Sequence, residues 1–536
     1  MREMEGKIPS WPTILLVIIF LLASFTPMLI GAGETETYGI FEEQVIVETL
    51  VGSGTEDDPY LIEDVHDLQN INRDLDAHYK LANDINASET LEWNNGSGFE
   101  PLGKETPFTG SFNGNDKMIS ELFVSRRGTN YVGIFSRIGE KGVIRNLVLV
   151  NNSVSGEWYV GTVAGENNGL VEKSDISSNV YGKTFIGGIT GRNNGTISNV
   201  NVTTKVRGTA AVGGAVGSAS SESSVKNMYG TSNIKGSGEL GGLIGLNYGI
   251  IENSHSNGKI FEEPPKGIAQ GCGGLVSSNF GIIRNSSASS NVNGYYHVGG
   301  LVKANYGTLE YSYSKGDVIG VENVGGLVGV AYKGRISNTY SIGNVLARHK
   351  NAGGLVGRNN ATIYNSYALG DVDVLDLKEE GEVNAGGFVG KNDGLVESCY
   401  AVGNVTSTHD SGVSGLIGIN DGTVIHSFWD VEASGIDISD GGTGLRTKEM
   451  SGKNAPNSMD GFDFSETWET IESNDKDALD DGYPIFREWN REEQLKAQGV
   501  YTKDDDIDDI DLIGLVIPLI VIGITIGVIV YHKKKS

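Results

Sequence analysis

A short glycine-rich unit recurs through the middle of this 536-residue chain. The copy that begins at Gly325 reads GGLVGVAYKGRISNTYSIGNV, and the copy at Gly353 reads GGLVGRNNATIYNSYALGDV. Glycine pairs begin, at intervals of 26 to 33 residues, at Gly187, Gly213, Gly241, Gly273, Gly299, Gly325, Gly353 and Gly386. Looser copies at Gly133, Gly161 and Gly415 make eleven. A unit this short cannot bury a core alone, so the copies must stack on one another.

The copies have the composition of short strands rather than helices. They are rich in β-branched residues, bounded by Gly and Asn, and lack a helical period. In the second strand, apolar and polar residues alternate on one face, as in Ile251, Asn253 and His255. The same pattern recurs at Ile336, Asn338, Tyr340 and at Ile363, Asn365, Tyr367. We therefore expect an all-β fold, a β-solenoid (β-helix) of about eleven ~26-residue repeats with about three strands per turn.

Two sets of asparagines recur with the unit. One set lies in the second strand, where a stacked column of side-chain amides can hydrogen-bond from turn to turn. Its members are Asn146, Asn199, Asn227, Asn253, Asn285, Asn338 and Asn365. The other set forms N-x-G elements, in which we expect the positive φ of tight corners. These are Asn247–Gly249, Asn279–Gly281, Asn305–Gly307, Asn392–Gly394 and Asn420–Gly422.

The segments that flank the array are expected to cover the exposed edges of a solenoid. Residues 50–130 form an N-terminal cap leading into the solenoid of residues 131–428, and Leu68, Ile71 and Leu75 predict a short amphipathic helix after Asp64. Residues 429–487 form a C-terminal cap with Trp429, Trp468, Tyr483 and Phe486. Residues 488–511 become acidic and are expected to form a solvated stalk.

Both ends of the chain predict membrane targeting. Residues 1–32 contain an apolar stretch, Ile14–Phe25, behind Arg2 and Lys7, which is typical of a cleaved signal peptide, with an uncleaved signal anchor as the alternative. Residues 512–531 are uncharged and long enough to span a bilayer. The lysines of the tail 532–536 place it in the cytoplasm and the bulk of the chain outside, as a single-pass cell-membrane protein. Gly523 and Gly527 form a GxxxG that would support a dimer.

Charge and cysteine content exclude other classes. Lys and Arg total 41 against 68 Asp and Glu, a net charge of −27, so nucleic acid is not an expected partner. The two cysteines, Cys272 and Cys399, lie four copies apart, nearly 20 Å in a stack of this kind. A disulfide needs Cα atoms within about 7 Å, so both thiols should be free.

The copies resemble GLUG repeats, named for their Gly-Leu-hydrophobic-Gly core, here Gly326, Leu327, Val328 and Gly329. The flanks GSGTEDDPYLIEDVHDLQNI and SFWDVEASGIDISDGGTG resemble the segments that bracket such arrays, so the resemblance covers roughly residues 52–487. It implies a surface protein of bacteria or archaea, often adhesin-like, with β-helical architecture and no single activity. Some members carry a zinc peptidase, which requires an HExxH helix, and the eight histidines contain no such pair.

We therefore expect an adhesin-like or envelope-structural surface protein, without catalytic residues, cofactor or metal. The alternative is a polysaccharide lyase or glycosidase on the same scaffold, which needs paired carboxylates across a groove. Glu172 and Glu252 lie in the outward column, but they alternate there with Lys226, Arg284 and Ser337, as on an ordinary solvated face.

The expected partners are surface glycans or proteins of the envelope or of a neighbouring cell. The two longest intervals insert loops at one corner, 261–270 and 373–383, and Glu262, Glu263, Glu379 and Glu380 are their candidate contact residues, although surface corners also accept insertions freely. Candidate N-glycosylation sequons, about as many as chance provides, occur at Asn86, Asn95, Asn151, Asn194, Asn201, Asn285, Asn360 and Asn404.

Overall fold

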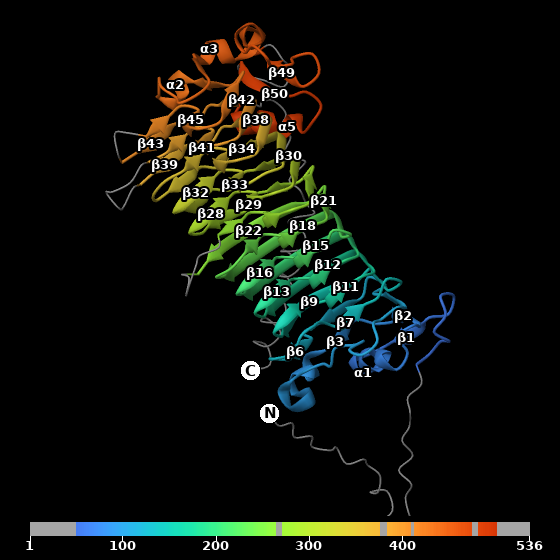
Figure 1. The fold of residues 1–536 in the computed structure, drawn as a ribbon. Coiled ribbons are helices and arrows are strands. Elements are labelled where there is room, and N and C mark those ends of the chain that lie inside the picture. The colour runs from blue at the N-terminus through green and yellow to red at the C-terminus, as the bar shows by residue number, and fades with distance from the viewer. Residues whose placement is uncertain (1–49, 264–270, 376–382, 409–411, 474–480, 501–536) are drawn as a thin grey trace, which may run out of the picture. The chain divides into compact units, whose positions relative to one another are not determined.

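The computed structural model describes residues 50–263, 271–375, 383–408, 412–473 and 481–500. Within them the chain winds through successive turns whose strands pair in parallel with the turns before and after (Figure 1). The predicted β-solenoid is confirmed, with about eleven turns and three parallel sheets. The expected signal peptide and the expected transmembrane segment lie outside the described residues. No helix within the described ranges is long and apolar enough to cross a bilayer.

The eleven predicted copies correspond one for one to the strands of the second sheet. Each strand begins just after its glycine pair, or after the single glycine of a looser copy. These strands are β7(Phe135–Ile138), β11(Ala164–Asn167), β14(Thr190–Asn193), β17(Val216–Ala219), β20(Ile244–Asn247), β24(Val276–Asn279), β29(Val302–Asn305), β33(Val328–Ala331), β37(Val356–Asn359), β41(Val389–Asn392) and β45(Ile417–Asn420).

The first sheet contains the strands that lead into the glycine pairs. They are β10(Trp158–Val160), β13(Thr184–Gly187), β16(Ala210–Gly213), β19(Leu240–Gly241), β23(Cys272–Gly273), β28(Tyr296–Gly299), β32(Glu322–Gly325), β36(Ala352–Gly353), β40(Ala385–Gly386) and β44(Val413–Ser414). The glycine pairs allow the turns to approach closely. A Cβ on Gly326 would lie 2.1 Å from the carbonyl oxygen of Gly354 in the next turn, so no side chain fits there.

The third sheet carries one to three strands per turn and extends beyond the repeats to both ends. It begins with β1(Tyr60–Ile62), β2(His78–Leu81), β3(Ile85–Asn86), β4(Ser111–Asn113), β5(Met118–Ser120), β6(Phe123–Ser125), β8(Val143–Arg145), β9(Val148–Ser155), β12(Leu170–Tyr181), β15(Thr196–Gly208) and β18(Ser224–Gly236). It continues with β21(Ile250–Glu252), β22(His255–Glu262), β25(Ile282–Arg284), β26(Ser287–Ala288), β27(Asn291–Asn293), β30(Thr308–Ser314), β31(Val318–Gly320), β34(Arg335–Ser341), β35(Val345–Ala347), β38(Thr362–Ala368), β39(Val372–Val374), β42(Leu395–Ala401), β43(Val405–Ser407), β46(Thr423–Ile425), β47(Phe428–Asp430) and β48(Thr443–Leu445).

The roles expected for the two asparagine sets are exchanged. The asparagines assigned to the second strand have φ between 46° and 55° and occupy a left-handed bend, so the alternation expected through Asn253 is wrong. Some of them still bond in pairs, as Asn227 Nδ2 does to Asn199 Oδ1 at 3.0 Å. The N-x-G asparagines have ordinary φ, and most of them are fully buried. Asn247 donates to Asn279, and Asn279 to Asn305, each at 2.8 Å, so these asparagines form the internal ladder.

The N-terminal end contains the predicted helix. Asp64 caps α1(Val65–Asn70) by accepting hydrogen bonds from the backbone amides of His66 and Asp67. A 3-10 turn, η1(Ile71–Arg73), follows, and Leu68 and Ile71 are fully buried. A second 3-10 segment, η2(Ser88–Gly96), extends between β3 and β4. These elements lie together at the blue end of the stack in Figure 1.

The C-terminal segment covers a side of the solenoid as well as its end. At the end, α2(Val431–Ser434) follows β47, and Trp429 donates to the carbonyl of Ile436. Beyond it lie α3(Thr447–Met450), η3(Gly452–Asn454), α4(Ala455–Ser458) and the antiparallel pair β49(Trp468–Ile471) and β50(Gly482–Phe486). Trp468 and Phe486 pack along a column of stacked tyrosines from consecutive turns, Tyr340, Tyr367 and Tyr400.

The predicted stalk also differs from the structure. Residues Arg491–Gln498 form helix α5, in which Gln494 and Leu495 are buried, so this part of residues 488–511 is not solvated. The reason is the tyrosine column, which supplies an apolar surface and hydroxyl groups for the helix to bond. The cysteine prediction is confirmed, since Cys272 and Cys399 are free and buried. Burial raises the pKa of both thiols, which keeps them protonated.

Candidate interaction surface

The outward residues of the second sheet and its corner form the most distinctive surface of the solenoid. At the corner, one residue of each turn follows the last residue of the second-sheet strand. In the four central turns this residue is aromatic: Tyr248, Phe280 and Tyr306 in N-x-G elements, and Tyr332 at the equivalent position after Ala331. Their rings stack nearly parallel, with centroids 4.6 to 4.7 Å apart. We call these four residues the aromatic row, and three of them are at least 39% exposed.

The fold does not require aromatic side chains at this corner. Earlier turns place Asn168 and Asn194 at the equivalent position, and later turns place Asn360, Asp393 and Asp421 there. Stacking contributes about 0.5–1.5 kcal/mol per pair beyond simple burial, so the row also stabilises the central turns. Its exposed ring edges remain a continuous apolar strip between polar flanks, which is typical of a binding surface.

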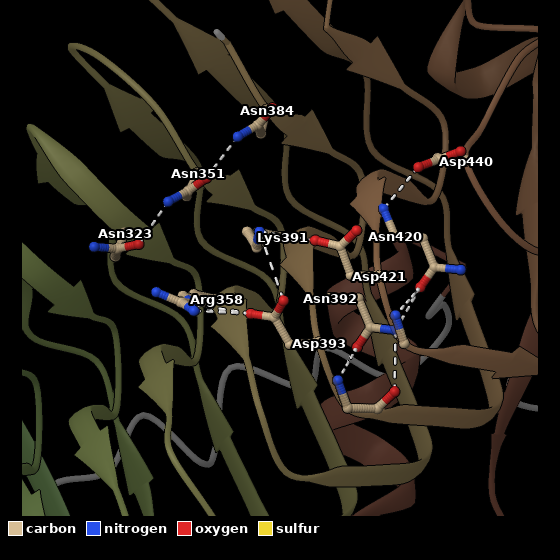
Figure 2. Close-up of polar contacts among 12 residues, drawn as sticks. Asn323, Asn351, Arg358, Asn384, Lys391, Asn392, Asp393, Asn420, Asp421 and Asp440 are labelled. Atoms are coloured by element: carbon tan, nitrogen blue, oxygen red, sulfur yellow. Dashed lines mark hydrogen bonds and ion pairs between the residues drawn. The ribbon is translucent and has the colours of Figure 1, made fainter.

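Figure 2 shows a charged network in the turns that follow the row in sequence. Arg358 contacts Asp393 at 3.0 Å, and Lys391 lies between Asp393, at 3.5 Å, and Asp421, at 2.9 Å. The pKa of Lys391 is raised, chiefly by its hydrogen bond to Asp421, so the Lys391 ammonium stays protonated. Beside the network, Asn323, Asn351 and Asn384 form a third asparagine ladder, with 2.8 Å bonds.

Of the two outward carboxylates considered for catalysis, Glu252 is engaged with cations. Glu252 contacts Arg284 at 2.8 Å and Lys226 at 3.5 Å, from the turns on either side. This matches the alternation of charges in the sequence. No group of three or more His, Cys, Asp or Glu side chains in the described ranges could hold a metal ion.

The candidate loop residues separate into structural and surface positions. Glu262 is buried, and its carboxylate accepts hydrogen bonds from the backbone amides of Gly271 and Tyr295, so it braces the corner rather than facing a partner. Glu263 is at the surface, where it contacts Arg207 at 2.9 Å and Lys235 at 3.4 Å. Glu379 and Glu380 lie outside the described residues.

Seven of the eight candidate sequon asparagines are exposed: Asn86, Asn95, Asn151, Asn201, Asn285, Asn360 and Asn404. Asn194 is half-buried, and its amide donates to Glu166 and Asn168. The aromatic row was not among the contact residues expected from the sequence. Its signal lies in the residue after the asparagine of each N-x-G element, which is aromatic at Tyr248, Phe280 and Tyr306.

Comparison with known proteins agrees with the repeat unit. The family model described as the GLUG motif matches residues 349–373, which confirms the resemblance. The chain is thus a parallel β-solenoid in which residues 349–373 match the GLUG motif.

Two relatives share part of the chain. Over 145 residues, 26% of this chain, it is 46% identical to "Halomucin" of Haloquadratum walsbyi. Over 131 residues, 23% of this chain, it is 36% identical to "Putative Gly-rich membrane protein" of Evansella cellulosilytica. The matches span 2% and 15% of those relatives' own lengths. The match to a solved structure described as a putative immunoglobulin A1 protease from Bacteroides ovatus covers 81% of this chain and 94% of that chain, at 17% identity and with a TM-score of 0.29.

Proposed function

We propose that this protein is a non-catalytic, membrane-anchored surface protein that acts in adhesion or envelope structure through the outer face of its solenoid. The observation that carries the proposal is the aromatic row, an exposed apolar strip at a corner where other aligned repeats have serine, asparagine or aspartate. Exposed apolar strips cost solubility and are kept where a partner covers them.

Two further observations support a surface role. One partial relative is named a membrane protein and the other halomucin, and the termini of this chain have the composition of a signal peptide and a membrane span. The pairing of Glu252 with Arg284 and Lys226 favours a binding scaffold over a hydrolase, because the Glu252 carboxylate is already engaged with two cations.

The test uses cells that display the full chain. A quadruple variant replaces each ring of the row with asparagine: Tyr248→Asn, Phe280→Asn, Tyr306→Asn and Tyr332→Asn. Asparagine already occurs at the equivalent position of other turns, as Asn194 and Asn360. We expect adhesion to neighbouring cells or isolated envelopes to fall by at least about tenfold, while the thermal midpoint falls modestly from the loss of stacking.

The matched control replaces exposed tyrosines away from the row, in a Tyr181→Asn and Tyr229→Asn double variant, since both are more than 40% exposed. This control should adhere as the parent does. Equal adhesion by the quadruple variant and the parent would refute the row as the contact surface. Release of reducing sugars from a glycan by the parent would refute the non-catalytic assignment.

A further inference from the structure

A shallow hollow lies at the N-terminal end of the solenoid, apart from the aromatic row. It has a volume of about 500 Å³, within the range of small-molecule sites. Its lining comes from α1 and η1, from η2 and from the segment after η2. The lining residues are Gln69, Asn70, Asn72, Arg73, Trp93, Asn94 and Glu100.

The wall of the hollow is a single partly exposed tryptophan. The Trp93 ring is supported by His66, with centroids 4.9 Å apart, and by Phe99, at 6.5 Å in a stacked arrangement. Because neighbouring rings hold it, the indole offers a preorganised apolar surface on a rim that is otherwise polar. Such a ring surface packs against the C–H groups of a flat ligand at little entropic cost.

The amide groups around the ring are held in place by backbone contacts. Gln69 both donates to and accepts from the backbone of Glu100, at 2.9 Å each, and Asn72 accepts from the amide of Gly103 at 3.1 Å. Asn94 donates to the carbonyl of Gly98 at 2.8 Å. Among the described residues, the side chains of Asn70, Arg73 and Glu100 make no hydrogen bond or ion pair, so an amide, a guanidinium and a carboxylate remain for a ligand.

The backbone that carries Trp93 turns sharply. Asn94 and Asn95 both have left-handed conformations, with φ of 51° and 55°, and Gly96 and Gly98 follow with φ of 79° and 77°. Asparagine and glycine adopt this conformation more readily than other residues, so these residue types support the turn that places the indole at the hollow.

We propose that this hollow binds a neutral glycan, with a sugar ring against Trp93 and its hydroxyls bonded by Asn70, Arg73 and Glu100. An aromatic face with amide, carboxylate and guanidinium groups around it matches a pyranose, which has C–H faces and a hydroxyl rim. The cation of Arg73 and the anion of Glu100 balance, and the net charge of −27 repels polyanions, so a neutral sugar fits better than a uronate polymer. The assignment rests on the proposed surface role and names one class of partner for it.

The experiment measures binding of neutral hexose oligosaccharides to the full chain in lipid nanodiscs, which avoid sugar-headed detergents. Hexuronate oligosaccharides serve as the anionic comparison. Calorimetric titration should show saturable binding of a neutral oligosaccharide and at least tenfold weaker binding of its uronate counterpart. Trp93→Ala should lower the affinity at least tenfold, and Asn70→Ala, at a half-buried position outside the core, should lower it several-fold.

The matched control is Trp158→Ala, which removes a tryptophan that is 48% exposed on the flank of the solenoid. This variant should bind as the parent does. The proposal is overturned if no neutral oligosaccharide binds, if uronates bind better, or if Trp93→Ala and Asn70→Ala both bind like the parent. The quadruple aromatic-row variant should retain saccharide binding, so loss of adhesion there and loss of saccharide binding here can be told apart.

Discussion

The hydroxyl of Tyr367 donates a 3.0 Å hydrogen bond to Oε1 of Gln494, a residue 127 positions further along the chain. The same oxygen accepts from the amide of Phe486, and the Gln494 amide donates to the carbonyls of Phe486 and Trp489. One fully buried side chain thereby fixes the C-terminal segment to the tyrosine column.

Replacing Gln494 with leucine should release this segment. Buried donors and acceptors left without partners cost about 1–3 kcal/mol each, and Gln494→Leu leaves several. We expect faster hydrogen exchange over residues 482–498 while the turns from β11 to β29 stay protected. The control is Glu492→Gln, which removes only a surface pair with Lys496 and should change exchange little. Unchanged exchange in Gln494→Leu would contradict the role assigned to it.

His255 should make stability depend on pH. The pKa of His255 is lowered to about 4, against about 6.5 in an unfolded chain. Burial of the imidazole is the largest cause, and the positive charge of Lys315 is the second. The unfolded chain therefore binds this proton more readily, so stability is full above pH 6.5 and falls as the pH drops toward 4.

The expected loss at pH 4 is about 2 kcal/mol after allowance for partial solvent access. The next turn has serine, Ser287, at the position aligned with His255, so His255→Ser introduces a residue that the fold already accepts there. In this variant the urea concentration at the unfolding midpoint should change less between pH 6.5 and pH 4 than it does in the parent. An equal pH dependence in this variant would assign the effect to other groups.

The internal asparagine ladder should tolerate alanine better than aspartate. Asn279→Ala leaves Asn247 and Asn305 each without one hydrogen-bond partner, which should lower the free energy of unfolding by about 2 kcal/mol. Alanine already occurs in this column, at Ala219 and Ala331. Asn279→Asp places a charge there and should cost about 3–5 kcal/mol at pH 7. Urea unfolding of both variants, followed by tyrosine fluorescence, measures the order, and the reverse order would be inconsistent with a neutral amide ladder.

Alanine substitutions at two glycines distinguish the free-energy cost of a steric clash from the cost of an unfavourable backbone conformation. In Gly326→Ala the new Cβ meets the Gly354 carbonyl oxygen at 2.1 Å, so the turns must separate, at more than about 3 kcal/mol. In Gly128→Ala the nearest atom is 3.9 Å away but φ is +80°, so only backbone strain of about 1 kcal/mol arises. The thermal unfolding midpoint of Gly128→Ala should lie well above that of Gly326→Ala. Similar midpoints would show that neighbouring turns move apart locally at little cost.

The repeat could be predicted because glycine pairs mark eight of the eleven copies and set their register. The asparagines could not be assigned correctly, since the same residue suits both a left-handed bend and a buried amide ladder, and only packing decides between Asn253 and Asn247. The docking of α5 was not predictable, because the contact between Tyr367 and Gln494 has no periodic signal. The hollow beside Trp93 combines segments from the non-repetitive end, so spacing alone could not assemble it.

The tyrosine column has a kinetic consequence. Neighbouring turns are 26 to 33 residues apart, so each turn can add to the one before as the chain is synthesised. Asn490 bonds to Tyr340 across 150 residues, so the segment that covers the column comes last. During synthesis the rings of Tyr340 and Tyr367 therefore stay exposed to solvent until the remaining residues have been made. The chain can aggregate through these rings until α5 packs on them.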